Sequence, residues 1–337
     1  MVEPIRWGVL GTANIALKRF IPAVVGSRNG IVVAIASRDV VRARESAGRL
    51  GIAKAYGSYE ALLADPDVDA VYNPLPNSLH AEWTLHAAEA GKPVLCEKPL
   101  ALDSAQARHM IAGCRTRGVT LMEAFMYRFH PQHARVRTLF GEGAIGELRV
   151  VRADFTFLLE PFRRDNVRLQ HSLGGGALMD VGCYAINAMR MIFGEEPRWA
   201  SAQWDFREEF GVEVAATAVL GFSDHRMGTF DCGFRAAGQG SYTVVGTKGQ
   251  IDVLNAFVPG EADVSVLVTT GSERRDERIA GVNQYRLEAE EFADALLQQR
   301  APAMSPDDAL GTLKAIEALR ASARDGGLRH DVEPSDR

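Results

Sequence analysis

The sequence is poor in the residues that cross-link a chain or bind metal ions. Its 337 residues include four cysteines, which lie far apart in mostly apolar stretches, at Cys96, Cys114, Cys183 and Cys232. This spacing excludes a disulfide framework and a paired-cysteine zinc motif, and no H-E-x-x-H pattern occurs. We therefore expect reduced thiols in the core and no bound metal.

Long apolar runs and an excess of positive charge are also missing. No apolar stretch reaches the ~18 residues that a membrane helix needs. The 38 Lys and Arg residues are scattered and outnumbered by 43 Asp and Glu, which gives a formal net charge of -5 and argues against nucleic-acid or membrane binding. The start, MVEPIRWGVL, does not resemble a signal peptide, so we expect a cytoplasmic protein.

The first 125 residues alternate apolar strands with amphipathic helices. Strand-like runs such as IRWGVLG, IVVAIAS, AVYNPLP and PVLCEKP are separated by helical stretches such as RARESAGRLG and HAEWTLHAAEAG. Strands that are apolar throughout are typical of a parallel sheet with helices on both faces. The sequence thus predicts the α/β class, with a doubly wound parallel sheet in a first domain over residues 1–125.

The pattern changes after residue 125. A predicted helix, HPQHARVRTLFGEGAIG, precedes an alternating strand, GELRVVRADFTFLL, and several short strand-like runs with Gly, Asp or Ser turns follow between residues 212 and 268. Two helices close the chain. We predict a second α/β domain over residues 126–330 with an open, mainly antiparallel sheet, and a disordered tail over residues 331–337.

A glycine-rich loop lies between the first strand and the first helix. It reads Gly11-x-Ala13-x-x-Ala16, so it fits the dinucleotide pattern G-x-G-x-x-G/A except that alanine replaces the middle glycine. Backbone amides at the start of the helix would bind a pyrophosphate, although a plain tight turn is the alternative. The context predicts a Rossmann dinucleotide-binding domain whose phosphate loop comprises Gly11, Thr12, Ala13, Asn14 and Ile15.

The end of the second strand predicts which dinucleotide binds. NAD sites place Asp or Glu there to bond the ribose hydroxyls. This chain has Ser37 and Arg38 instead, with Arg42 one helical turn later, and a hydroxyl with guanidinium groups suits the 2′-phosphate of NADP. Asp39 is the alternative ribose ligand and would permit NAD. We predict NADP, with NAD as a weaker alternative.

Two further segments predict proton-transfer chemistry. Lys98 follows the apolar strand PVLCE, at the edge of a parallel sheet where ligands bind. After the triplet Gly174-Gly175-Gly176, Asp180 and Tyr184 are four residues apart and share one helical face. A lysine beside a phenol favours the phenolate, so Tyr184 would exchange a proton with a substrate oxygen during hydride transfer. Asp180 would bond a substrate hydroxyl or hold Lys98.

Together these motifs resemble the Gfo/Idh/MocA oxidoreductases over nearly the whole chain. The resemblance rests on the first loop and on the strings NPLPNSLH, CEKP, MEAFMYRFHP and GGGALMDVGCY. It is nearest to the branch of dimeric dihydrodiol dehydrogenase and NADP-dependent D-xylose dehydrogenase, because Tyr184 stands where many members carry histidine.

The resemblance implies roles for further residues. Part of the cofactor site would be formed by Asn73, Pro74, Leu75, Asn77, His80 and Glu97, with Lys98 aimed by a cis bond before Pro99. His80 has helix capping as its alternative role. Candidate substrate-binding residues are Arg128, Arg164, Asn166 and Arg168. The family also implies a carbohydrate-like small-molecule substrate and a homodimer or higher homo-oligomer.

Several functions stay open at this point. The pattern favours an NADP-dependent sugar dehydrogenase, such as an aldose 1-dehydrogenase acting on D-xylose. A trans-dihydrodiol dehydrogenase and a keto-sugar reductase are alternatives within the same class. A non-catalytic NADP-binding sensor would not need both Lys98 and Tyr184. An NAD-dependent inositol-type enzyme would carry histidine at position 184 and an acidic residue at position 37.

Overall fold

The computed structural model describes residues 3–334, and their contacts divide into two compact units. Unit 1 combines the chain up to Met126 with Asn283–Ala309, and unit 2 combines Tyr127–Val282 with the chain from Leu310. Within the described residues, no helix is long and apolar enough to cross a membrane.

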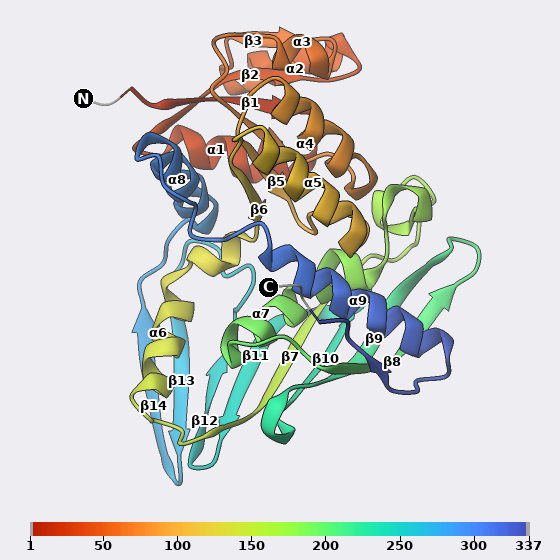
Figure 1. Cartoon of the computed structure of the whole chain (residues 1–337). Coiled ribbons are helices and arrows are strands. Elements are labelled where there is room, and N and C mark those ends of the chain that lie inside the picture. The colour runs from red at the N-terminus through yellow and green to blue at the C-terminus, as the bar shows by residue number, and fades with distance from the viewer. Residues whose placement is uncertain (1–2, 335–337) are drawn as a thin grey trace. The chain divides into compact units, whose positions relative to one another are not determined.

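A parallel sheet forms the centre of unit 1 (Figure 1). Across the described residues its six strands lie in the order β3-β2-β1-β4-β5-β6, which is the doubly wound order of the Rossmann fold. The strands are β1 (Ile5–Leu10), β2 (Gly30–Ala36), β3 (Lys54–Tyr56), β4 (Ala70–Asn73), β5 (Val94–Glu97) and β6 (Leu121–Ala124). The strand order reverses between β1 and β4, and ligands of such sheets bind beside the carboxyl ends of the strands there.

Helices connect these strands and cover the sheet. Figure 1 shows α4 and α5 lying side by side, and the two helices are in contact. Aspartate caps begin two of the helices, since Asp39 accepts hydrogen bonds at the start of α2 and Asp103 does so at α5. The helical segments of unit 1 are η1 (Ala16–Phe20), α1 (Ile21–Val25), α2 (Val40–Leu50), α3 (Tyr59–Leu63), η2 (Asn77–Leu79), α4 (His80–Glu89), α5 (Ser104–Thr116) and α8 (Gln284–Leu297).

The position of α8 differs from the predicted domain division. We expected residues 126–330 to form one domain, but α8 packs on α1 and β2 in unit 1. Asn29 Nδ2 donates to Asp294 Oδ1 at 2.8 Å, and Arg28 forms an ion pair with Asp294. These contacts join segments more than 250 residues apart, so local periodicity in the sequence could not reveal them.

The sheet of unit 2 is mixed and mainly antiparallel, as predicted. In the described part of the chain it has nine strands in the order β14-β13-β12-β11-β7-β10-β9-β8-β15, and β10 runs parallel to β7. The strands are β7 (Leu148–Leu158), β8 (Trp199–Arg207), β9 (Val212–Gly221), β10 (Met227–Gly233), β11 (Arg235–Gly246), β12 (Gly249–Val253), β13 (Val264–Thr270), β14 (Glu273–Ile279) and β15 (His330–Asp331).

Helices pack on this sheet and include a π-helical segment at the predicted site. Helix α6 contacts β13, whereas η6 and α7 contact β7 and β10. The predicted helix after residue 130 is shorter than expected, because α6 ends at Gly141. The helical segments are η3 (Met126–Phe129), α6 (Pro131–Gly141), η4 (Val167–Leu169), η5 (His171–Leu173), η6 (Leu178–Gly182), α7 (Cys183–Phe193), η7 (Ser223–His225) and α9 (Asp308–Arg324).

The predicted disordered tail needs a correction. His330 and Asp331 form β15, which pairs antiparallel with β8. Val332 is buried and its amide donates to Arg198 O at 3.0 Å. Backbone pairing at a sheet edge and one buried apolar side chain thus order a segment of polar composition. Residues 335–337 of the predicted tail lie outside the described residues.

Candidate active site

The predicted phosphate loop follows β1 in unit 1. Gly11 has φ +88°, and a Cβ at this position would meet Leu75 Cδ2 at 2.9 Å. Its amide donates to Ala36 O at 2.8 Å, which ties the loop to the end of β2. The rest of the loop contains the buried Thr12, the half-buried Ala13 and Ile15, and the exposed Asn14. Only glycine fits this tight turn without strain.

The residues after β2 separate into capping and solvent-facing groups. Asp39 Oδ1 accepts hydrogen bonds from the amides of Val41 at 2.9 Å and Arg42 at 3.3 Å, so this carboxylate is the cap of α2. The buried Ser37 accepts from the Asp39 amide at 3.2 Å. Arg38 and Arg42 are exposed. The two guanidinium groups are therefore accessible to an anion, and Asp39 caps the helix through one of its two carboxylate oxygens.

Tyr59 interacts with Arg38 and Arg42, although the sequence did not identify it as a site residue. Its hydroxyl lies 3.7 Å from the position of a Cβ on Gly11. Burial raises the pKa of Tyr59, and the charge and hydrogen bond of Arg38 and the charge of Arg42 oppose this increase. Tyr59 thus connects the phosphate loop to both arginines. It lies on α3, about 20 residues beyond Arg38, and no motif marks it.

Asn73 and His80 brace the loops rather than face solvent. Both side chains are completely buried. Asn73 Nδ2 donates to His80 O at 3.3 Å and Thr84 Oγ1 at 3.2 Å, and its Oδ1 accepts from the Leu75 amide at 3.3 Å. The contact of Asn73 with the cofactor stays a prediction. Among the neighbouring residues that were also predicted for the cofactor site, Pro74 and Leu75 are buried and Asn77 is half-buried.

The ring of His80 lies between two backbone carbonyls. Nδ1 is 2.9 Å from Pro99 O and Nε2 is 2.8 Å from Leu75 O. Burial lowers the pKa of His80 to about 4, so the neutral ring donates to one of the two carbonyls. His80 therefore links the loop after β4 to the loop after β5. The His80 side chain does not cap α4, and its contact with the cofactor stays a prediction.

Lys98 follows β5, and its neighbours hold the backbone at this point. The peptide between Lys98 and Pro99 is cis, as the resemblance implied. Glu97 Oε1 accepts from the Tyr72 hydroxyl at 2.5 Å, and Glu97 Oε2 accepts from the Lys98 amide at 3.3 Å. The Leu100 amide donates to Glu123 Oε1 at 2.7 Å. Two carboxylates thus fix the backbone on either side of Lys98.

In unit 2, a tight glycine turn leads into the segment that carries Asp180 and Tyr184. Gly176 has φ +113°, and a Cβ there would lie 2.5 Å from Glu213 Oε1. The same oxygen accepts from the Leu178 amide at 3.1 Å. Asp180 then lies in the π-helical η6, and Tyr184 lies in the first turn of α7.

Tyr184 is surrounded by aromatic rings of unit 2. It is 5% exposed, and its ring centroid lies 5.7 Å from Tyr127, 5.1 Å from Phe155 and 5.5 Å from Phe257. One turn farther along α7, Asn187 Oδ1 accepts from Tyr127 Oη at 2.6 Å and from Arg128 Nη1 at 3.2 Å. Arg128, a predicted substrate residue, is half-buried beside this network.

The loop before the glycine turn contains the other predicted substrate residues. Arg168 Nε donates to Asp180 Oδ2 at 2.6 Å, and its guanidinium lies 5.6 Å from the centroid of Phe157. Asn166 Oδ1 accepts from the Arg168 amide at 3.1 Å and so caps a turn. Arg164 is exposed over Phe210. The side chains of Asp180 and Arg168 are thus brought together, whereas Asn166 contacts the backbone of Arg168 and Arg164 packs over Phe210.

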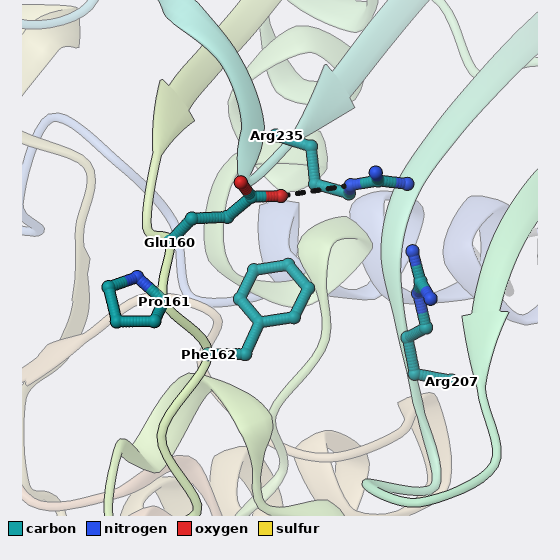
Figure 2. A pocket seen from close by; sticks show the side chains of 5 residues that line it. All are labelled: Glu160, Pro161, Phe162, Arg207 and Arg235. Atoms are coloured by element: carbon teal, nitrogen blue, oxygen red, sulfur yellow. Dashed lines mark hydrogen bonds and ion pairs between the residues drawn. The ribbon is translucent and has the colours of Figure 1, made fainter.

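One open pocket of unit 2 is lined by none of the predicted site residues (Figure 2). It has a volume of about 600 Å³ and is lined by Glu160, Pro161, Phe162, Arg207 and Arg235. Arg235 donates to Glu160 Oε1 at 3.3 Å and to Asp205 Oδ2 at 2.7 Å. Both carboxylates offset the charge of the arginines, so the pocket has no clear ionic preference. Across residues 3–334, no cluster of His, Cys, Asp or Glu has the geometry of a metal site.

Comparison with known protein families gives matches to both units. Residues 5–125 match the model of an oxidoreductase family with an NAD-binding Rossmann fold, and residues 133–252 match the GFO/IDH/MocA C-terminal domain.

Comparison with individual proteins gives matches over similar lengths. D-xylose 1-dehydrogenase (NADP(+)) 2 of Haloferax volcanii is 39% identical over 95% of this chain and 98% of its own. Trans-1,2-dihydrobenzene-1,2-diol dehydrogenase of Xenopus laevis is 38% identical over 74% of each chain. The solved structure of KijD10, a 3-ketoreductase from Actinomadura kijaniata in complex with NADP and TDP-benzene, superposes with a TM-score of 0.90 at 35% identity. That match covers 95% of this chain and 98% of KijD10.

Proposed function

The chain belongs to the GFO/IDH/MocA family of oxidoreductases, and we propose that it oxidises a sugar or related polyol with NADP. The favoured reaction is that of an aldose 1-dehydrogenase, in which hydride leaves the anomeric carbon and a lactone forms. The similarity to the D-xylose 1-dehydrogenase over 95% of the chain supports this reaction.

The residues of unit 1 fit NADP better than NAD. Gly11 provides a tight turn that a side chain would block, and amides at the start of the following helix would bind phosphate oxygens. Arg38 and Arg42 are exposed beside Tyr59 and suit the additional phosphate of NADP. Asp39 caps α2 through Oδ1, which supports the proposal that the ribose-binding carboxylate of NAD sites is missing here. When bound, NADP supplies the hydride acceptor.

Two side chains of this chain carry the proposed proton transfer. Tyr184, as the phenolate, accepts the proton of the substrate hydroxyl while hydride leaves the same carbon. Lys98, as an ammonium, favours the phenolate and stabilises negative charge on the substrate oxygen. The observation that carries this proposal is the position of Lys98 after β5. It lies at the same edge of the parallel sheet as the phosphate loop after β1.

Absorbance of the reduced nicotinamide tests the proposal directly. The purified protein is mixed with NADP or NAD and with D-xylose, D-glucose, L-arabinose, myo-inositol or a trans-dihydrodiol. We expect turnover of an aldose with NADP and slower turnover with NAD. Turnover of myo-inositol with NAD in preference to NADP would overturn both the cofactor and the substrate assignment. Tight NADPH binding with no turnover of any substrate would favour a sensor.

Reduction of a keto-sugar is the second candidate function. It is favoured by the TM-score of 0.90 to the 3-ketoreductase KijD10. The same Tyr184 would then donate a proton to the carbonyl oxygen as hydride arrives. Oxidation of NADPH by a keto-sugar, without any aldose oxidation, would identify this function. The homodimer implied by the family also remains a proposal, and the mass of the protein in solution tests it.

A further inference from the structure

Three aromatic rings from separate segments of unit 2 surround the ring of Tyr184. Tyr127 comes from η3, Phe155 from β7, and Phe257 from the segment between β12 and β13. Their ring centroids lie 5.7 Å, 5.1 Å and 5.5 Å from that of Tyr184. Phe155 and Phe257 also stack on each other at 5.2 Å. The orientation of the Tyr184 phenol therefore depends on how these three rings are held.

Of these three rings, Tyr127 is the one with a hydroxyl, and this hydroxyl is bonded to the helix that carries Tyr184. Tyr127 Oη donates to Asn187 Oδ1 at 2.6 Å, and both side chains are completely buried. Asn187 lies three residues beyond Tyr184 in α7, so the two residues share one face of the helix. Tyr127 therefore contacts α7 twice, with its ring at Tyr184 and with its hydroxyl about one turn later.

Edge-to-face packing also holds the Tyr127 ring. The ring of His133 lies 5.0 Å away at an angle of 87°, and that of Phe257 lies 5.4 Å away at 81°. His133 is itself bonded at both nitrogens, since Nδ1 is 2.8 Å from Tyr242 Oη and Nε2 is 3.0 Å from Ala256 O. Ring contacts tolerate a range of distances and tilts, whereas a hydrogen bond favours one direction. The Tyr127 hydroxyl thus fixes a tilt that ring packing alone leaves open.

Proton transfer makes Tyr184 sensitive to this tilt. Its hydroxyl must lie within about 2.6–3.2 Å of the substrate oxygen, and a displacement of ~1 Å can lower the rate about 10²-fold. We propose that Tyr127 is a positioning residue for Tyr184: its hydroxyl bonds Asn187 and so holds the ring that orients the Tyr184 phenol. The inference rests on the proposed function, because it assigns a role in the same proton transfer.

Tyr127→Phe tests the role of the hydroxyl while it keeps the ring. The fold should tolerate the change, because Asn187 Oδ1 still accepts the hydrogen bond from Arg128 Nη1 at 3.2 Å. We expect kcat for the aldose to fall about 10-fold, with KM for the aldose and the affinity for NADPH unchanged. Normal kcat, or a rise in KM without any loss of kcat, would overturn the proposal.

A double-mutant cycle with Tyr184→Phe shows whether Tyr127 acts through the Tyr184 hydroxyl. If it does, Tyr127→Phe should have no further effect on the residual kcat of Tyr184→Phe, because the group that it positions is already gone. A loss of the same factor in both backgrounds would show that Tyr127 supports the structure in general, and it would overturn the positioning role.

Tyr242 offers a matched control in the same unit. It is 1% exposed, and its hydroxyl lies 2.8 Å from Nδ1 of His133 on α6. Tyr242→Phe removes a buried hydroxyl of the same kind, so it should lower the urea midpoint of unfolding. It should leave kcat unchanged, because this hydroxyl is bonded to α6. An equal loss of kcat in Tyr242→Phe and Tyr127→Phe would overturn the proposal.

Fluorine NMR of the protein labelled with 3-fluorotyrosine tests the positioning without turnover. The chain has seven tyrosines, and the signal of Tyr184 is the one that Tyr184→Phe lacks. Tyr127→Phe should broaden this signal, because the ring then samples more orientations, and Tyr242→Phe should not. A broadened signal in a protein that turns over no substrate would support the role of Tyr127 and overturn the proposed dehydrogenase. An unchanged signal would overturn the positioning role, whatever the protein turns over.

Discussion

Tyr184 is the single residue whose replacement tests the chemistry most directly. It is 5% exposed and packs against three aromatic rings of unit 2. Phenylalanine keeps this packing and removes the hydroxyl, so Tyr184→Phe should lower kcat about 10²- to 10⁴-fold. NADPH affinity, measured by fluorescence titration, should stay the same. Normal turnover in this variant would exclude Tyr184 from proton transfer.

Arg38 is the residue that should decide between the two dinucleotides. We propose that its exposed guanidinium near Tyr59 binds the additional phosphate of NADP, a group that NAD lacks. Arg38→Ala should weaken NADP about 10- to 100-fold and NAD much less. Titration with each reduced cofactor checks this expectation. Arg49→Ala, near the end of α2, is the control. Equal weakening of both cofactors would contradict the assignment of the 2′-phosphate.

At this scale, residue type and spacing were enough to select candidates but not their partners. Asp180 and Arg168 were both predicted as site residues, but the ion pair between them at 2.6 Å was not predicted. Asn73 and His80 were selected as cofactor contacts, and both are buried braces. Their roles depend on carbonyls of Leu75, His80 and Pro99, and the positions of backbone groups on other segments are not encoded in a local motif.

At the scale of an element, the turn before η6 depends on one glycine. Gly176 combines φ +113° with a Glu213 oxygen 2.5 Å from the position of a Cβ. Gly176→Ala should therefore lower the free energy of unfolding by about 2 kcal/mol or more. Gly48→Ala is the matched control, because Gly48 is exposed within α2 and a Cβ there meets no atom within 4 Å. It should stabilise the protein by roughly 0.5–1 kcal/mol.

Urea unfolding at neutral pH measures both glycine variants. Similar midpoints for the two would show that the turn before η6 tolerates a side chain and that the Glu213 contact is not restrictive. Loss of stability in Gly176→Ala alone would confirm that glycine is required to position the segment with Asp180 and Tyr184.

Helices and strands were predictable where a regular pattern of apolar residues extended over many residues and ended at clear turns. The strands of the parallel sheet and the alternating β7 are of this kind, because a buried face imposes its period on the sequence. Strand β15 was not predictable, since it has two residues and owes its order to pairing with β8. The end of α6 at Gly141 was also missed, because further glycines after it suggested a later stop.

At the scale of the whole molecule, buried histidines should make stability fall in mild acid. Burial lowers the pKa of His80 to about 4 and that of His133 to about 3. An unfolded histidine titrates near 6.5. Below that pH the unfolded chain takes up protons that the folded chain does not, so the free energy of unfolding decreases. The decrease should reach about 3 kcal/mol per histidine by pH 4.

Urea midpoints between pH 8 and pH 4 check this dependence. Above about pH 7.5 the histidine contribution should be constant, because both states are then deprotonated. His133→Gln removes one of the two groups and should make the decrease below pH 6.5 shallower, whatever it does to stability at pH 8. A variant profile parallel to that of the wild type would contradict the role of His133.

The sequence by itself determined the α/β class, the alternation of strands and helices in the first 125 residues, the glycine turn after β1 and the helical segment with Asp180 and Tyr184. These features depend on periodicity and on residue types within short windows, where local sterics and burial act. Only the tertiary structure decided that α8 belongs with the parallel sheet and that β10 lies parallel to β7. It also decided which side chains meet: Tyr59 interacts with Arg38, and Arg168 forms an ion pair with Asp180 and lies over Phe157. Such pairings result from packing of segments brought together by the fold. Their contact energies depend on the three-dimensional neighbours of each side chain, which spacing along the chain does not specify.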